Sequence, residues 1–482
     1  MTVVTRFAPS PTGYLHVGGL RTALYAYLFA RQNKGKFILR IEDTDQKRYV
    51  EGAVESLQNA LKFFDLNWDE GPIFQSHRTA IYQKYAQQLL ESGKAYRCFC
   101  TSEELDAMRE QQAKLKIAPK YDRRCLELAP EKTAEKLAAG IPFVIRQLIP
   151  YKDIDFLDTI RGDMHFHGKD IDDQVLIKSD GLPTYHLANV VDDHEMEVTH
   201  VIRGEEWLPS TPKHLWLYEA FGWTPPIFAH LPLLLNPDRS KLSKRQGDVA
   251  AEDFVAKGYL KEAMINFIAF LGWNPGTEEE IFSLEDLVKR FSLDRVQKAG
   301  AVFNLEKLDW LNAHYLRAKT TKELTDLILP LLQKESWYSD ALPQKFSEAQ
   351  KEKILSSVQL RMKTLLDGPT MLRPFLLDTL DYKRELFFSE KMKVDEATVK
   401  LALENAIPAL EALDNYDEEE TIKAALVAVI EKLGLKNGQV LWPLRVALTN
   451  EEYSPGVFEL CRLMGKELTL KRLKATLEFF AV

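Results

Sequence analysis

The strongest constraint on the fold of this chain is an alternation of strand and helix patterns over residues 2–64. Residues 2–7 alternate in side-chain character like a strand, and residues 19–33 repeat apolar side chains at helical spacing. A second strand pattern follows at residues 36–41, and a second helix pattern at residues 52–64. Strands and helices in such quick succession predict a doubly wound sheet of parallel strands.

This alternation is interrupted between about residues 95 and 175. That stretch holds three cysteines, a basic segment and short strand candidates at 143–149 and 163–167, which together indicate an α+β insertion. We therefore expect an α/β N-terminal half with a split Rossmann-like sheet. Strand patterns return at 175–178, 199–203 and 228–235, with a helix pattern at 211–221. After residue 260 the pattern is helical, and residues 320–482 contain no alternating strand series, which predicts an all-α C-terminal half.

Composition excludes several classes of protein. A chain of 482 residues is long enough for several domains. The longest apolar run, Met264–Trp273, suits a buried helix better than a membrane span, and the N-terminus resembles a strand more than a signal peptide. We therefore expect a cytoplasmic protein. The formal net charge of -8 argues mildly against a nucleic-acid partner, although a local basic face would suffice to bind one.

Two short motifs indicate chemistry on a nucleotide. His16-Val17-Gly18-Gly19 follows the first strand and leads into a helix, where ligands of parallel sheets bind. Lys241-Leu242-Ser243-Lys244-Arg245 places three cations and a hydroxyl in one loop. Taken singly, the first is more often a plain turn and the second a solvated loop. Together they are suited to clamp a triphosphate whose α-phosphate is attacked and whose pyrophosphate leaves.

The pair resembles the HIGH and KMSKS signatures of class I aminoacyl-tRNA synthetases. Further segments are similar to the bacterial glutamyl-tRNA synthetase family over the whole chain: Arg6–Gly13, Arg40–Asp45, Ser179–Asn189 and Val201–Trp207. The motifs depart from the class consensus conservatively, since the histidine, Gly18 and both lysines are present. The resemblance implies a monomer that joins L-glutamate to the 3′ end of tRNA(Glu) through a glutamyl-adenylate. ATP with Mg²⁺ is then consumed, and AMP and pyrophosphate are released.

The resemblance also implies a domain order. A catalytic domain occupies 1–94 and 176–250, and its insertion at 95–175 contacts the tRNA acceptor end. A helical stem-contact domain follows at 251–320, and an all-helical anticodon-binding region at 321–482.

Candidate site residues follow from the same resemblance. His16, Lys241, Ser243 and Lys244 are the catalytic candidates, with ATP also bound by Gly18, Gly19, Glu206, Trp207, Leu233 and Leu234. Glutamate is expected to contact Arg6, Ala8, Ser10, Glu42, Tyr185, Asn189 and Arg203.

The residues themselves support part of this assignment. Arginine suits a carboxylate because its planar fork makes two parallel hydrogen bonds, and Arg6 and Arg203 both end predicted strands. Tyr185 and Asn189 are four residues apart and therefore lie on one face of a predicted helix. A single arginine at a strand end is more often part of a structural ion pair, and leucines such as Leu233 are more often plain packing.

The insertion carries a candidate metal site. Cys98, Cys100 and Cys125 are suited to hold a structural zinc ion with one further ligand. By resemblance to zinc-bearing members of the family, Tyr121 is the first choice for that ligand. Glu127 is the alternative, because it stands where some relatives carry histidine. The competing interpretation is a set of small buried residues without metal.

Two basic clusters are candidates for tRNA contact. Arg361 is expected to read the anticodon by resemblance, whereas the default interpretation of each cluster is a solvated helix face. The first cluster, in the insertion, contains Lys114, Lys116, Lys120, Arg123 and Arg124, and the second, near the end, contains Lys466, Lys471, Arg472 and Lys474.

Four other classes of protein share part of this pattern, and each differs from this chain in one feature. Glutaminyl-tRNA synthetase has a β-barrel anticodon part, and the truncated glutamyl transferase that modifies a tRNA base has none. A small-molecule nucleotidyltransferase would not explain the paired arginines. A zinc-stabilised RNA-binding protein with a degenerate core would not need His16 and Lys241. Whether tRNA(Gln) is also charged stays open.

Overall fold

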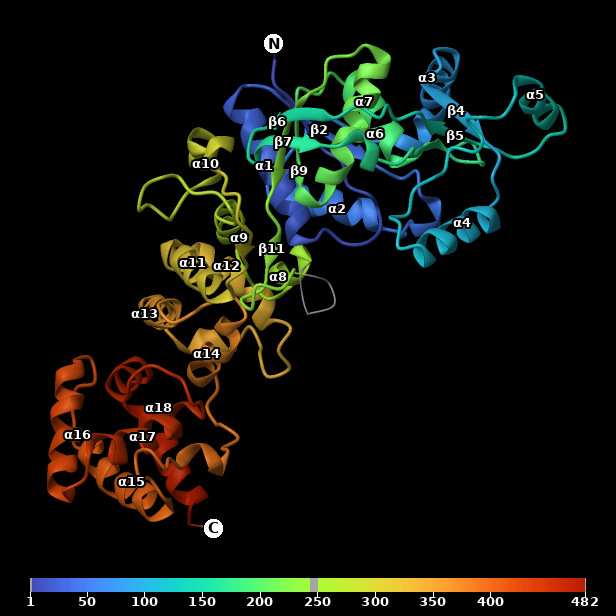
Figure 1. Ribbon diagram of the computed structural model, residues 1–482. Coiled ribbons are helices and arrows are strands. Elements are labelled where there is room, and N and C mark those ends of the chain that lie inside the picture. Colours follow the sequence, from blue (N-terminus) through green and yellow to red (C-terminus); the bar gives the residue numbers. More distant parts are fainter. Residues whose placement is uncertain (1, 243–249, 482) are drawn as a thin grey trace. The chain divides into compact units, whose positions relative to one another are not determined.

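The computed structural model describes residues 2–242 and 250–481. The chain divides into two compact units, which are described separately (Figure 1). The first consists of Met1–Ala256 and Lys261–Leu308, and the second of Lys257–Leu260 and Asp309–Val482. Within the described residues, no helix combines the length and the apolar character needed to cross a membrane.

A parallel three-stranded sheet begins the first unit. Its strands β1 (Val4–Phe7), β2 (Lys36–Ile41) and β3 (Glu70–Phe74) lie in that order. Helix α1 (Val17–Gln32) connects β1 to β2, and α2 (Ala53–Phe63) connects β2 to β3. Nearly every side chain of β1 and β2 is buried, as expected for parallel strands covered on both faces. The elements predicted for residues 2–64 are confirmed.

The second half of the sheet comes from a later part of the chain. β10 (Ile227–Leu231) runs parallel to both of its neighbours, β6 (Ile154–Asp158) and β9 (His200–Gly204). β7 (Gly162–Phe166) pairs antiparallel with β6 at the outer edge, although this hairpin falls within the sequence of the expected insertion. Thr199 donates its backbone N–H to the carbonyl of Val4 at 3.0 Å, so β9 starts beside β1. The split α/β architecture is confirmed.

The insertion contains a small antiparallel sheet. Its strands are β4 (Ala95–Cys98), β5 (Val144–Gln147) and β8 (Val175–Ile177), in that order. Two helices, α4 (Ser102–Lys114) and α5 (Pro130–Ala138), lie between β4 and β5 in the sequence. The side chains of Thr101 and Glu104 form a reciprocal capping box at the start of α4, which explains where this helix begins.

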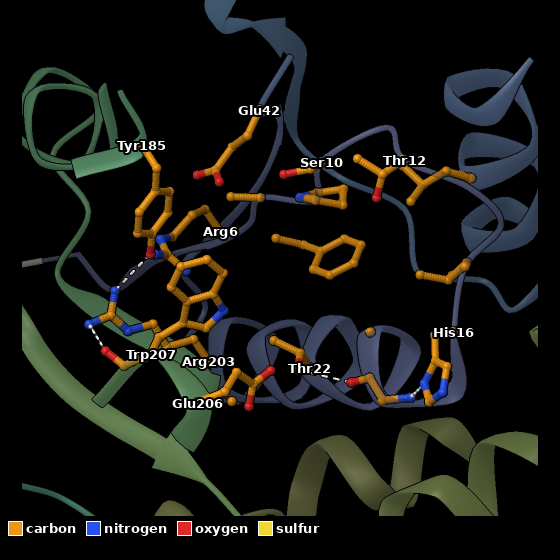
Figure 2. Close-up of a pocket in the computed structure, with 18 of the residues that line it drawn as sticks. Arg6, Ser10, Thr12, His16, Thr22, Glu42, Tyr185, Arg203, Glu206 and Trp207 are labelled. Atoms are coloured by element: carbon orange, nitrogen blue, oxygen red, sulfur yellow. Dashed lines mark hydrogen bonds between the residues drawn. The ribbon is translucent and has the colours of Figure 1, made fainter. Parts of the chain in front are cut away.

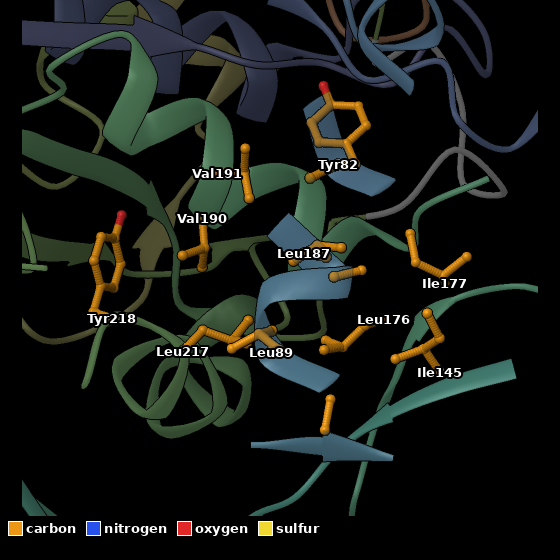
Figure 3. Close-up of a cluster of buried hydrophobic side chains, with 13 residues drawn as sticks. Tyr82, Leu89, Ile145, Leu176, Ile177, Leu187, Val190, Val191, Leu217 and Tyr218 are labelled. Carbon is orange, nitrogen blue, oxygen red and sulfur yellow. The ribbon is translucent and has the colours of Figure 1, made fainter. Parts of the chain in front are cut away.

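Three helices pack against this small sheet and form a buried core (Figure 3). They are α3 (Thr79–Glu91), α6 (Tyr185–Glu195) and α7 (Thr211–Phe221). The core fixes the position of α6, whose first turn faces the cavity described below. Its labelled members are Tyr82, Leu89, Ile145, Leu176, Ile177, Leu187, Val190, Val191, Leu217 and Tyr218.

Short elements complete the first unit. β11 (Leu234–Leu235) pairs parallel with β12 (Ala301–Val302), and α8 (Ala251–Ala256), α9 (Lys261–Ala269) and α10 (Leu284–Arg290) are helices. The buried helix predicted around Met264–Trp273 corresponds to α9. Ser283, followed by Glu285 and Asp286, is typical of a helix start, and it caps α10 by accepting a hydrogen bond from the backbone N–H of Asp286.

The second unit is built from helices, and residues 309–481 contain no strand, as predicted. One correction concerns Lys436–Gly438, whose Lys-Asn-Gly sequence predicts a turn. The turn lies earlier, because Gly434 ends α16 in the left-handed conformation, with φ 61°, and α17 already begins at Asn437. Helix α11 (Leu305–Ala318) belongs to this unit from Asp309 onward. The helices that follow it are α12 (Thr321–Leu332), α13 (Glu348–Gln359), α14 (Asp367–Leu376), α15 (Glu396–Glu411), α16 (Glu419–Leu433), α17 (Asn437–Thr449) and α18 (Val457–Phe479).

We predict that Leu187→Ala lowers the free energy of unfolding by about 2–5 kcal/mol, because Leu187 is fully buried in the core around α6 and its loss leaves a cavity. Denaturant titration followed by circular dichroism measures the change. The matched control is Leu137→Ala on the exposed surface of α5, where the change should stay within about 0.5 kcal/mol. Equal losses for the two variants would contradict the assignment of this core.

Candidate active site

Two cavities meet at the N-terminus of α1, beyond the carboxyl end of β1. The first has a volume of about 300 Å³ (Figure 2) and the second about 390 Å³. His16, Gly18, Gly19, Thr22, Gly204 and Glu206 line both, so the two form one continuous site. The position agrees with the rule that ligands of such sheets bind past the strand ends. The predicted residues lining the first cavity are Arg6, Ala8, Ser10, His16, Gly18, Gly19, Glu42, Tyr185, Asn189, Arg203, Glu206 and Trp207.

His16 caps helix α1. Its Nδ1 accepts a hydrogen bond from the backbone N–H of Gly18 at 2.9 Å, which turns the ring across the helix start (Figure 2). A Cβ at Gly18 would lie 3.2 Å from this ring and 3.8 Å from Leu234, so a side chain here would crowd the His16 ring. The N-terminal N–H groups and the positive end of the helix dipole suit an anion here.

The second cavity lies against a hairpin that carries part of the Lys241–Arg245 motif. Leu233, Leu234 and Lys241 all line it, as the sequence predicted for one nucleotide site. The backbone N–H of Leu242 donates to the carbonyl of Leu234 at 2.9 Å, which brings Lys241 to the cavity. The other two predicted residues of the motif, Ser243 and Lys244, lie outside the described residues.

Arg203 is a buried cation with neutral partners. Only 5% of the residue is exposed, and it lies at the wall of the first cavity. Its Nη1 donates to the hydroxyl of Tyr185 at 3.0 Å, and its Nη2 to Thr211 at 2.9 Å. Among the described residues, every hydrogen-bond partner of Arg203 is uncharged. A buried charge held in this way is costly unless a ligand supplies the opposite charge.

The buried side chains of His230 and Asp158 hold Arg203 in its orientation. Nε2 of His230 accepts a hydrogen bond from Nε of Arg203 at 3.0 Å, and its Nδ1 lies 2.6 Å from Oδ2 of Asp158. Burial lowers the pKa of His230, although Asp158 opposes the shift. Burial would raise the pKa of Asp158, but bonds from His230 and the backbone of Arg161 hold it below its ordinary range. The ionised carboxylate therefore accepts a hydrogen bond from Nδ1–H of His230, which leaves Nε2 as the acceptor for Arg203.

Two more histidines near Arg203 are neutral as well. Burial lowers the pKa of His186 to about 3, and it lowers the pKa of His214 well below its ordinary value, with Arg203 adding to that shift. Nδ1 of His214 lies 3.4 Å from Nη1 of Arg203, and Nε2 lies 3.1 Å from His186. The imidazoles around the guanidinium therefore position it without repelling its positive charge.

Arg6 differs from Arg203 because it already has a counterion. Its Nε lies 3.1 Å from Oδ1 of Asp193, and both side chains are almost fully buried. Burial would raise the pKa of Asp193, but Arg6 and Arg40 outweigh it and lower the pKa. Arg6 lines the cavity as predicted, and its charge is shared with a carboxylate of the protein.

Glu42 is the carboxylate that faces the first cavity (Figure 2). Burial raises its pKa above the ordinary value, and Arg40, whose Nη2 lies 3.5 Å away, opposes that shift. The Asn189 amide meets this group in one of its two orientations. It donates to Oε1 of Glu42 at 3.3 Å or, turned over, donates to Asp193 and accepts from Arg40. A buried acidic group beside a small cavity suits a ligand ammonium.

Several supporting residues were missed from the sequence. Arg40, Asp193, Asp158 and His230 have partners more than 25 residues away, which no local pattern reveals. Arg21, which lines the second cavity, donates to the carbonyls of Leu271 and Pro232, so its charge supports the wall of this cavity. Thr22 also lines both cavities, and a signal for it was available, since it is one turn beyond Gly18 on the same helix face.

The three insertion cysteines come together as predicted. Their Sγ atoms lie within 4.8 Å of one another, and those of Cys100 and Cys125 are 3.5 Å apart. Two thiolates bound to one tetrahedral zinc ion are separated by about 3.8 Å, so the cluster can hold a metal ion. The hydroxyl of Tyr121 lies 3.3 Å from Cys98 and 3.4 Å from Cys100. Glu127, by contrast, is exposed and is not part of the cluster.

The basic clusters are only partly solvated. In the insertion, Arg123 pairs with the buried Asp173 at 2.7 Å, and Arg124 with Asp122 at 2.6 Å, whereas Lys114 and Lys116 are exposed.

In the second unit, Arg361 pairs with Glu459 at 2.7 Å. The solvated face expected near the C-terminus is wrong for Arg472, which is 1% exposed and donates to the carbonyls of Leu448 and Leu377. The physical reason is a bend in α18 at Gly465, whose φ is 75°, after which different positions face the core. Cys461, an isolated cysteine in a helical pattern and therefore a candidate core residue, is fully buried.

Comparison with known proteins first defines the class. A family model described as "tRNA synthetases class I (E and Q), catalytic domain" matches residues 2–310. A second, described as "Anticodon binding domain", matches residues 323–477. The α/β half with its cavity is therefore the catalytic domain of a class I aminoacyl-tRNA synthetase, and the helical half contains an anticodon-binding domain.

Individual relatives narrow the class. A glutamate–tRNA ligase of Clostridium botulinum is 46% identical, with 98% of this chain and 97% of that protein covered. One of Chlorobium luteolum is 47% identical over 100% of this chain and 98% of its own length. The crystal structure of a glutamate tRNA ligase from Elizabethkingia meningosepticum in complex with its amino acid matches with a TM-score of 0.85 at 38% identity, covering 99% of each chain. The chain belongs to the glutamate–tRNA ligase family, whose activity is the ligation of glutamate to tRNA.

We predict that Asp158→Asn raises the KM for glutamate about 10- to 100-fold and leaves the KM for ATP nearly unchanged. An asparagine amide can donate to Nδ1 of His230, which moves the proton to Nε2 and removes the acceptor for Arg203; a hydrogen bond to a charged group is worth about 1.5–3 kcal/mol. Aminoacylation kinetics with each substrate varied in turn measure both constants. Asp163→Asn on the exposed edge strand β7 is the control. Parallel changes in both constants would contradict a positioning role.

Proposed function

We propose that the two joined cavities bind L-glutamate and ATP side by side and form glutamyl-adenylate, from which glutamate passes to the 3′ end of tRNA(Glu). The observation that carries the proposal is Arg203, a buried cation whose partners are uncharged and which lines the first cavity. A substrate carboxylate would complete its electrostatics. ATP fits the second cavity, because α1, Lys241 and the apolar Leu234 offer anion-binding and apolar surfaces.

Within the first cavity we assign opposite roles to two groups. Arg203 binds the side-chain carboxylate of glutamate, and Glu42, with Ser10 nearby, binds the ammonium. Arg6 is held by Asp193 and acts at the wall of the cavity, with Ala8 and the helix residues Tyr185 and Asn189 completing it. Glutamine would leave Arg203 without a counterion, and that cost supplies the discrimination against it.

The reaction needs positioning and charge stabilisation more than a protein nucleophile. The α-carboxylate of glutamate attacks the α-phosphorus of ATP, and negative charge grows on the departing pyrophosphate. His16 and the helix N-terminus face the phosphates, and Lys241 stabilises the leaving group, together with Ser243 and Lys244 in the same motif. Glu206 and Trp207 bind the ribose, and Leu233 and Leu234 bind the adenine. Mg²⁺ enters with ATP and contributes further neutralisation of the phosphates.

The tRNA is proposed to lie against both units. The insertion at 95–175 takes the acceptor end, helices within 251–320 contact the stem, and the region 321–482 takes the anticodon. The family match at residues 323–477 supports the last assignment. Exposed Lys114 and Lys116 are suited to phosphate contact. Arg361 is the proposed anticodon reader. It would have to break its ion pair with Glu459 before it could contact the RNA.

A structural zinc ion is the proposed occupant of the cysteine cluster. Cys98, Cys100, Cys125 and Tyr121 are its four ligands, because their donor atoms converge and thiolates suit zinc. The ion would hold β4 and the segment after α4 together, without a direct part in the chemistry. None of the four cysteines, all of which the structure describes, forms a disulfide bond, which suits the reducing cytoplasm as the proposed location.

Two single substitutions should separate the two substrates. Arg203→Ala should raise the KM for glutamate steeply, because truncating one partner of a desolvated charge pair costs on the order of 2–5 kcal/mol. Lys241→Ala should instead slow glutamate activation and leave the KM for glutamate nearly unchanged. Steady-state charging assays with glutamate and ATP varied separately measure both effects.

The control for these variants is Arg31→Ala, which removes an arginine at the other end of α1, where it pairs with Asp69. It should alter neither KM. If Arg203→Ala changed the KM for ATP and spared that for glutamate, the amino-acid pocket would be wrongly assigned.

Metal analysis tests the cysteine cluster. His165 and His167, two exposed histidines whose ring nitrogens lie close enough to hold a second ion, are first replaced by Asn so that the cysteine cluster is measured by itself. This variant, purified without chelator, should contain about one zinc ion per chain, and adding Cys98→Ser should lower that content. The loss should reduce kcat/KM for tRNA more than for ATP, since the ion would stabilise the insertion. Cys461→Ser is the control, because Cys461 is buried in α18 of the other unit. A zinc content insensitive to Cys98→Ser would favour the metal-free interpretation.

A further inference from the structure

A second group of metal-binding side chains lies on the β6–β7 hairpin. His165 lies on β7, and His167 directly follows the end of that strand in extended backbone, so the two side chains point to the same face. Asp153 lies just before β6 and reaches the same place. All three side chains are about half exposed, at 51%, 52% and 51% for His165, His167 and Asp153. A metal ion in solution would therefore have direct access to them.

The donor atoms of these residues are spaced for one metal ion. Nε2 of His165 lies 3.3 Å from Nδ1 of His167 and 3.8 Å from Oδ2 of Asp153. The third edge, from Nδ1 of His167 to Oδ2 of Asp153, is 3.0 Å. For ligands about 2.0 Å from a tetrahedral ion, the expected spacing is about 3.3 Å. The three atoms thus form one triangular face of such a site with little rearrangement.

Neighbouring groups orient two of the three ligands. Oδ1 of Asp155, directly across the hairpin from His165, lies 2.7 Å from Nδ1 of that ring. The Nδ1 proton is then held by the carboxylate, and the lone pair of Nε2 faces His167. The backbone N–H of Gly168 donates to Oδ1 of Asp153 at 3.1 Å, which leaves Oδ2 for the ion. Such outer contacts are typical of histidine and carboxylate ligands to metals.

We propose that Asp153, His165 and His167 bind a divalent transition-metal ion of the zinc type, with water at the remaining position. Two imidazoles and one carboxylate favour Zn²⁺, Ni²⁺ or Cu²⁺ over Mg²⁺ or Ca²⁺, which prefer oxygen ligands. This site is separate from the cysteine cluster, which is built on β4 and the segment after α4. The ion links the start of β6 to the end of β7 and so closes the open end of the hairpin.

Equilibrium dialysis against Zn²⁺ tests the proposal on the full-length protein. Cys98→Ser combined with Cys100→Ser provides the background, because it removes the other thiol-rich site. This variant should still bind about one zinc ion per chain, and adding His165→Asn and His167→Asn should abolish that binding. The matched control adds His77→Asn and His194→Asn instead, which removes two imidazoles that are not in the cluster and should leave the stoichiometry unchanged.

Two further measurements separate a built site from loose association. Cu²⁺ bound to the same background should show electron-paramagnetic-resonance coupling to two imidazole nitrogens, and this coupling should be lost in the His165/His167 variant. Asp155→Asn should weaken zinc affinity about 10-fold or more through the ring orientation alone. Aminoacylation and thermal unfolding of the histidine variant should match the parent without added metal. Zinc binding that survives the histidine substitutions, or that is lost equally in the control, would overturn the proposal.

Discussion

The buried ion pair between Arg40 and Asp193 joins strand β2 to helix α6, which comes from a later part of the chain, and the architecture of the site depends on it. Arg40 comes from β2 and Asp193 from α6, with 2.8 Å between Nη1 and Oδ1. Both side chains are almost fully buried, and Arg6 binds the same carboxylate from β1. Removal of one partner from such a pair typically costs about 3–5 kcal/mol, because the other charge is left buried without compensation. The small cavity beside Glu42 therefore has walls of fixed charge and fixed spacing.

Two arginines at the ends of parallel strands consequently have different functions. Arg6 is neutralised by Asp193, whereas Arg203 is surrounded by Tyr185, Thr211 and imidazoles that burial keeps uncharged. One cation thus lies at the cavity wall with uncharged partners, and the other is part of the buried framework. The histidines achieve this because a neutral imidazole accepts a hydrogen bond without adding a counter-charge. On the β6–β7 hairpin, Asp155 lies beside Nδ1 of His165, so the lone pair of Nε2 is directed at the neighbouring side chains.

Much of the fold could be predicted because it is encoded in local periodicity. The strand at residues 36–41 and the helix at 211–221 have the bounds expected from their apolar spacing. Many predicted site residues also line one cavity, because the ends of parallel strands meet at the same edge of the sheet. Predictions were weaker where a single residue decides the geometry. Gly434 ends α16, so the turn there comes earlier in the sequence than predicted, and Gly465 bends α18.

The sequence by itself determined the order of strands and helices, the helical C-terminal half, and a set of residues that converge on one cavity. Motif residues are short-range features, and their spacing along a strand or helix decides where they point. Only the tertiary structure decided which charged groups are already paired. Asp158, His230 and Arg203 meet across 27 to 72 residues of chain, and Arg472 finds its carbonyl partners 24 and 95 residues away. Such partners are selected by packing of distant segments, which removes water and makes each unpaired polar group costly, and no local pattern carries that information.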